Sequence, residues 1–101
     1  MKVNLDIPFR NFQGEPIREN GKEVTMAEFV GKALFGFGQG GQQTLEQSEM
    51  IRAYDIIRKL QTNPSEVSLS SEDITFIKEK MAKVLTVGCY GQLYMVLEQE
   101  N

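Results

Sequence analysis

The chain has 101 residues, of which 41% are hydrophobic and 25% charged, and its net charge at pH 7 is −3. This length suffices for one domain, which we expect to span residues 1–101, and the composition is typical of a globular protein. The acidic balance argues against a dedicated DNA or RNA binder, which usually carries a basic excess. No run of 18 or more apolar residues occurs, so we expect no membrane-spanning helix.

The cysteine content and the first residues indicate a cellular location. Cys89 is the only cysteine, so no intramolecular disulfide can form. Residues 3–9 alternate apolar with polar side chains and lack the continuous apolar stretch of a signal peptide. We therefore expect a cytoplasmic protein.

A small antiparallel meander is predicted at the start of the chain. The alternation in residues 3–9 has the period of a half-buried strand. A turn follows and leads to a short return strand at residues 16–18. Asn20 and Gly21 then form a two-residue hairpin signal, because both residues tolerate a positive φ. The hairpin would bring residues 22–24 back along the return strand.

Two capped helices are predicted next. The first begins at the capping box of Thr25 and Glu28 and is ended by Gly36 and Gly38. The second begins near Thr44 and ends before Pro64, because the residue before a proline avoids the helical region. Its expected apolar stripe consists of Met50, Ala53, Tyr54, Ile57 and Leu60.

Two further helices complete the predicted fold. Residues 66–69 would either add a strand or lead into a third helix, which begins at the capping box of Ser70 and Asp73. A fourth, short helix is expected over residues 90–99. We therefore predict an α+β fold, with a small N-terminal antiparallel β-meander or hairpin followed by about four helices.

The sequence offers few groups for catalysis or metal binding. It has no histidine, the commonest general base and metal ligand near neutral pH. Cys89 lies among apolar residues, as a packing cysteine does. The carboxylate pairs Glu46 with Glu49 and Glu72 with Asp73 lie near predicted helix N-termini, where they meet the helix dipole favourably. We expect no catalytic residue, no metal site, no cofactor and no enzymatic activity.

A loop rich in glycine and glutamine joins the first two predicted helices. Backbone N–H groups before a helix N-terminus attract anions, so this loop would bind a small anionic ligand such as a nucleotide. It lacks the lysine of a Walker A loop and does not follow a strand, as a dinucleotide fingerprint would. The alternative interpretation is a plain connector. The candidate ligand-binding residues are Gln39, Gly40, Gly41, Gln42, Gln43 and Thr44.

Basic side chains cluster modestly on the second and third predicted helices. If the two clusters met in space, they could follow a phosphate backbone. Acidic residues are interspersed, which favours a solvated face of mixed charge, and nucleic acid is not the expected partner. The candidate residues are Arg52, Arg58, Lys59, Lys78, Lys80 and Lys83.

Several apolar residues exceed what one helix stripe can bury. They would either widen the core or form a patch for a protein partner, and self-association would bury such a patch. The candidate interface residues are Phe35, Phe37, Ile56, Phe76, Tyr94 and Met95.

Three stretches of the chain carry a resemblance. They are residues 1–5 with Gly14 and Ile17, residues 69–73 with Ile77 and Lys78, and residues 90–93 with residues 96–98. Together they resemble small proteins of unknown function encoded by bacteriophages and prophages. The resemblance implies a compact, often oligomeric accessory protein that works by contact, and it brings no catalytic residue.

Three functions follow as hypotheses. The first is a non-enzymatic interaction module that self-associates, acting in virion assembly or on a host protein. The second is a binder of a small anionic ligand at the glycine-rich loop. The third is a nucleic-acid accessory protein that uses the basic residues.

Overall fold

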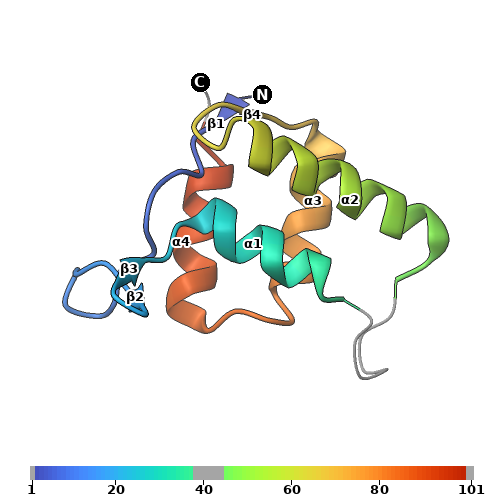
Figure 1. Cartoon of the computed structure of the whole chain (residues 1–101). Coiled ribbons are helices and arrows are strands. Elements are labelled where there is room, and N and C mark those ends of the chain that lie inside the picture. Colours follow the sequence, from blue (N-terminus) through green and yellow to red (C-terminus); the bar gives the residue numbers. More distant parts are fainter. Residues whose placement is uncertain (1, 38–44, 100–101) are drawn as a thin grey trace.

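The computed structural model describes residues 2–37 and 45–99 (Figure 1). Its elements are β1 (Lys2–Val3), β2 (Arg18–Glu19), β3 (Lys22–Glu23), α1 (Met26–Phe35), α2 (Gln47–Thr62), β4 (Val67–Ser68), α3 (Ser71–Met81) and α4 (Val87–Leu97). Two antiparallel strand pairs and four helices in these residues confirm the predicted α+β class. Within the same ranges, no helix has the length and apolar character needed to cross a membrane.

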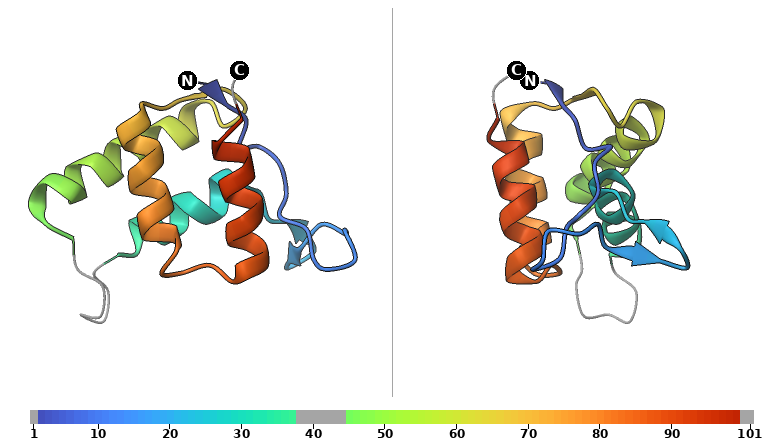
Figure 2. Two further views of the ribbon diagram at one scale, coloured as in Figure 1. Left: turned by 180° about the vertical axis from the view of Figure 1, so that it is seen from behind. Right: turned by 90° about the vertical axis from the view of Figure 1, so that its left-hand side faces the viewer.

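The helices form two layers (Figure 2). α1 and α2 lie in one layer, and α3 and α4 lie in the other. One hydrophobic core fills the space between them, and every helix contributes to it. Side chains that are almost completely buried include Leu5, Phe9, Val30, Ile56, Ile77 and Leu93.

The N-terminal segment keeps its predicted alternation but pairs with another part of the chain. Only β1 forms a strand, and it pairs antiparallel with β4, so that Val3 lies opposite Val67. Beyond β1, the Leu5 carbonyl accepts from the Ala27 N–H at 2.9 Å, at the start of α1. The prediction of one strand over residues 3–9 was therefore wrong, because most of this segment pairs with a helix start. Of the two alternatives left open for residues 66–69, the structure shows the strand, which is β4.

The hairpin at Asn20 and Gly21 is confirmed. β2 and β3 pair antiparallel around these two residues, which have φ of 52° and 81°. The expected meander is present as single hydrogen bonds beyond the hairpin. The Ile17 N–H donates to the Phe9 carbonyl at 2.8 Å, and the Val24 N–H donates to the Ile17 carbonyl at 2.9 Å.

Side-chain caps begin the helices largely where the sequence predicts them. The Thr25 hydroxyl accepts from the Glu28 N–H at 3.1 Å and begins α1. α2 begins later than predicted, because Glu46 caps it in a box with Glu49; Thr44 lies outside the described residues. α2 ends at Thr62 with Asn63 as its C-cap, just before Pro64 as expected, and α4 begins at Val87, earlier than residue 90.

The buried face of α2 differs from the predicted stripe. Met50 and Tyr54 are each 58% exposed, whereas Ile56 is completely buried. Ile56 lies on the arc of the helix between Leu60 and the side that contacts α3. Because α2 packs toward the second layer as well as against α1, its buried face is turned toward Ile56 and away from Tyr54.

The α2–α3 contact centres on the buried carboxylate of Asp73, which is 5% exposed. Arg52 donates to one carboxylate oxygen at 2.9 Å, and Lys59 approaches the other at 3.4 Å. The Ser70 N–H also donates to Asp73 at 3.1 Å, which completes the capping box of α3. A second ion pair joins the helices about two turns further along α3, between Lys80 and Glu49 at 2.8 Å.

These partners set the protonation of Asp73. Burial raises the pKa of this carboxyl. The Ser70 N–H and the Lys59 ammonium together lower the pKa by more than burial raises it, so the pKa lies below its usual value. A carboxylate held in this way stabilises the folded state while it is ionised.

We expect Asp73→Asn to lower the free energy of unfolding by about 1–3 kcal/mol, because two cations lose a charged partner. Urea denaturation measures this change. Glu72→Gln is the matched control, since Glu72 also pairs with Arg52 but its side chain is 79% exposed. An exposed pair contributes at most about 1 kcal/mol. Equal losses in the two variants would contradict the central role of Asp73.

The pH dependence of stability should also depend on Asp73. Its folded pKa lies below the unfolded value of about 3.9, so its contribution is complete above that pH and is lost as the pH falls through the folded pKa. Between roughly pH 5 and pH 2, the melting temperature of the wild type should therefore fall more steeply with decreasing pH than that of Asp73→Asn. Parallel curves would show that Asp73 is not responsible.

Candidate functional site

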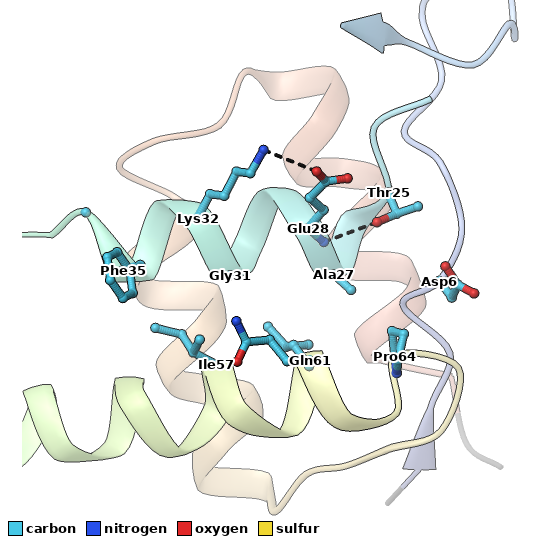
Figure 3. Close-up of a pocket in the computed structure, with 12 residues that line it drawn as sticks. Asp6, Thr25, Ala27, Glu28, Gly31, Lys32, Phe35, Ile57, Gln61 and Pro64 are labelled. Carbon is cyan, nitrogen blue, oxygen red and sulfur yellow. Dashed lines mark hydrogen bonds and ion pairs between the residues drawn. The ribbon is translucent and has the colours of Figure 1, made fainter. Parts of the chain in front are cut away.

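A groove with a volume of ≈ 650 Å³ lies on the outer face of the first helical layer, between α1 and α2 (Figure 3). We call it the α1–α2 groove. α1 and α2 run in opposite directions along its two sides, so that Phe35 marks one end and Pro64 the other. Its lining combines small and apolar residues with a few polar ones: Ala27, Gly31, Phe35, Ile57, Leu60 and Gln61 are among them.

The spacing of small residues on α1 explains why the groove is open. Ala27, Gly31 and Phe35 follow one another at four-residue intervals and therefore share one face of the helix. A Cβ atom built on Gly31 would lie 3.8 Å from the Leu60 Cδ1 atom, across the floor of the groove. Because Gly31 has no side chain, the space above Leu60 is left unfilled.

The rim of the groove exposes apolar surface. Phe35 is 73% exposed at the end of α1. On α2, Met50 and Tyr54 are each 58% exposed. Met50 and Tyr54 are four residues apart, so they share the face of α2 that continues to Ile57 in the groove. Exposed apolar surface gathered beside a groove is typical of an interaction site.

Few charges border the groove, and most are already paired. Glu28 and Lys32 form an exposed ion pair at 3.1 Å on the α1 side. The Thr25 hydroxyl caps α1 and is not free to act as a nucleophile. Asp6 lies at the Pro64 end (Figure 3). This lining offers apolar contact with a charged edge, which suits binding of an apolar protein segment.

The structure separates the six candidate interface residues. Phe35 is exposed on the groove, and Phe37 is partly buried against the core. Ile56 and Phe76 are 0% and 6% exposed, so assigning them to an interface was wrong. The two layers of helices bury these side chains, because a core shared by both layers covers a wide arc of each helix.

Tyr94 and Met95 remain exposed but lie on α4, away from the groove. Their exposed fractions are 42% and 68%. The Lys78 ammonium lies 4.2 Å from the centre of the Tyr94 ring, and Lys78 also pairs with Glu98. Tyr94 is thus part of a local contact between α3 and α4.

Four of the six candidate nucleic-acid residues are held in ion pairs. Arg52 and Lys59 bind Asp73, while Lys78 pairs with Glu98 and Lys80 with Glu49. Arg58 and Lys83 are exposed. The basic residues therefore serve mainly to join helices, and acidic groups neutralise the surface that they would present to phosphate.

The candidate ligand-binding residues Gln39 to Thr44 lie outside the described residues. Among the residues that the structure describes, no group of three or more acidic, cysteine or histidine side chains could hold a metal ion. Cys89 is half-buried beside the core and lines a small hollow of ≈ 160 Å³ with Phe9 and Phe29.

The groove was not predicted from the sequence, although one signal for it exists. A glycine inside an amphipathic helix costs stability, so its presence points to a packing or binding reason. Gly31 is such a glycine. Its meaning depends on Leu60, which comes to lie opposite it only in the folded chain.

Filling the floor of the groove with one methyl group should stabilise the protein. We expect Gly31→Ala to raise the free energy of unfolding by about 0.5–1 kcal/mol, because alanine favours the helix and 3.8 Å is an ordinary contact. Gly21→Ala is the control, since its φ of +81° should make the same change destabilising. Urea denaturation measures the free energy of unfolding of both variants, which should rise in Gly31→Ala and fall in Gly21→Ala. A loss of stability in Gly31→Ala would show that the groove floor is closed.

Comparisons of the chain with protein-family models, with curated proteins and with solved structures found no match. The groove and its rim are therefore the features from which a function can be inferred.

Proposed function

We propose that this chain is a non-enzymatic protein-interaction module that self-associates through the α1–α2 groove. The observation that carries the proposal is the apolar groove with Phe35, 73% exposed, at its end. A small domain has a limited core, and covering such a surface with a second copy would add stability that the single chain lacks.

The amount of exposed apolar surface supports a second copy as the occupant. Phe and Tyr side chains bury about 150–250 Å² each, so the exposed parts of Phe35 and Tyr54 offer roughly 200–330 Å². Met50 and the groove walls add to this area. A stable interface buries about 800 Å² of each partner, and the face around the groove can supply much of this area.

The charges at the edge fit the same proposal. Interfaces commonly have an apolar centre and a polar rim. Glu28 and Lys32 neutralise one another beside the groove and leave its centre free of unpaired charge. The absence of histidine from the sequence and the capping role of Thr25 support binding in place of catalysis.

The resemblance to small bacteriophage and prophage proteins supports a setting for this contact. In that setting the self-associating module would act in virion assembly or on a host protein, in the cytoplasm of the host. Both tasks depend on contact surfaces and require no reaction.

The wild type should form a discrete oligomer in sedimentation velocity experiments, and variants of the groove should weaken it. We expect Gly31→Gln, which fills the groove, and Phe35→Ser, which removes its apolar end, each to weaken association by about tenfold or more. Circular dichroism checks that both variants fold.

Val87→Ser is the matched control, because Val87 is 92% exposed on α4 and is absent from the groove lining. It should leave the oligomer unchanged. A wild type that stays monomeric at high concentration, or an oligomer insensitive to both groove variants, would overturn the proposal.

A further inference from the structure

A turn far from the groove presents a completely exposed aromatic side chain. Phe12 is 100% exposed. It lies in the turn of residues 10–15, which precedes the β2–β3 hairpin and which we call the Phe12 turn. Burial of an aromatic ring is among the largest single contributions to a protein interface, so a ring held fully in water calls for an explanation.

Hydrogen bonds within the Phe12 turn fix its shape. The Asn11 N–H donates to the Glu15 carbonyl at 2.8 Å, and the Gly14 N–H donates to the Asn11 carbonyl at 2.9 Å. The Asn11 side-chain oxygen accepts from the N–H groups of Gln13 and Glu15, both at 3.0 Å. Gly14 has a φ of +86°, which a glycine adopts at little cost.

The turn is also tied to α4. The Arg10 N–H donates to the Gln92 side-chain oxygen at 2.8 Å, and the Gln92 amide donates back to the Arg10 carbonyl at 2.7 Å. The Arg10 guanidinium donates to the Gly14 carbonyl at 2.8 Å. Phe12 is therefore presented by a preorganised segment, which loses little conformational entropy when it binds.

We propose that Phe12 of one copy inserts into the α1–α2 groove of a second copy. This inference rests on the proposed self-association and names the two surfaces that meet. The groove has the volume for an aromatic ring and a floor of Leu60 and Ile57, with Phe35 available for ring contact. The Phe12 turn cannot fill the groove of its own chain, because it projects from the side of the molecule away from α2 (Figures 1 and 2).

The charges beside the two surfaces are complementary. Arg10 is the first residue of the Phe12 turn, and Asp6 borders the groove at its Pro64 end. Neither residue takes part in an ion pair within residues 2–37 and 45–99. Insertion of Phe12 would bring a cation of one copy toward a carboxylate of the other, and such complementarity orients a contact.

A mixing experiment tests this arrangement. Phe12→Ser removes the ring but keeps the groove, whereas Gly31→Gln fills the groove but keeps the ring. Each variant alone should dimerise more weakly than the wild type, by about tenfold or more, because the aromatic contact is lost on both sides of the dimer. An equimolar mixture should recover a dimer that holds one chain of each kind, since one intact ring then meets one intact groove. Native mass spectrometry resolves this species when one chain carries an isotope label.

Each outcome decides the inference. A mixed dimer that neither variant forms alone supports insertion of Phe12 into the groove. If Phe12→Ser associates like the wild type while Gly31→Gln and Phe35→Ser do not, the groove binds another part of the second copy: the inference fails and the proposed function stands. If association survives the groove variants, the proposed function itself fails. Should Gly31→Gln not fold, Phe35→Ser takes its place in the mixture.

Discussion

The buried carboxylate of Asp73 holds the two helical layers in register. A charge this deeply buried is tolerated only when it is paired and hydrogen-bonded, and here two cations of α2 and the first turn of α3 meet that need. Arg52 and Lys59 are seven residues apart and therefore lie on the same face of α2, two turns from each other. Together they fix both the rotation of α2 about its axis and its tilt relative to α3. This contact fixes which face of α2 is turned toward α3, and so which of its side chains remain on the groove side.

The same arrangement explains why the outer face of the first layer is free. α2 directs Ile56 and Leu60 toward the core and its cations toward α3, which leaves Tyr54 on the outside. α1 likewise needs only its inner face for packing, and Gly31 removes bulk from its outer side. The apolar groove is therefore not required by the core. Its exposure is a cost for the single chain, and that cost is the physical reason to assign it a role in contact.

The sequence predicted the features that neighbouring residues determine, and it did not predict those that distant residues determine. Caps at Thr25 and Ser70 and the turn at Asn20 depend on residues within one helical turn, and all were predicted correctly. The partner of β1 lies in β4, which alternation alone cannot reveal. Apolar spacing cannot show how many faces of a helix are covered, and for that reason Ile56 and Phe76 were misplaced. The groove was not predicted because a glycine in the sequence does not reveal which residue of another helix lies opposite it.

The pairing of β1 with β4 also has a consequence for synthesis of the chain. Val3 leaves the ribosome 64 residues before its partner Val67. At roughly 5–20 residues per second, that delay lasts about 3–13 s. During this interval Leu5 and Phe9, which end up completely buried, have neither α3 nor α4 to cover them. The nascent chain thus carries an uncovered apolar segment for seconds, which is long enough for a chaperone to bind it.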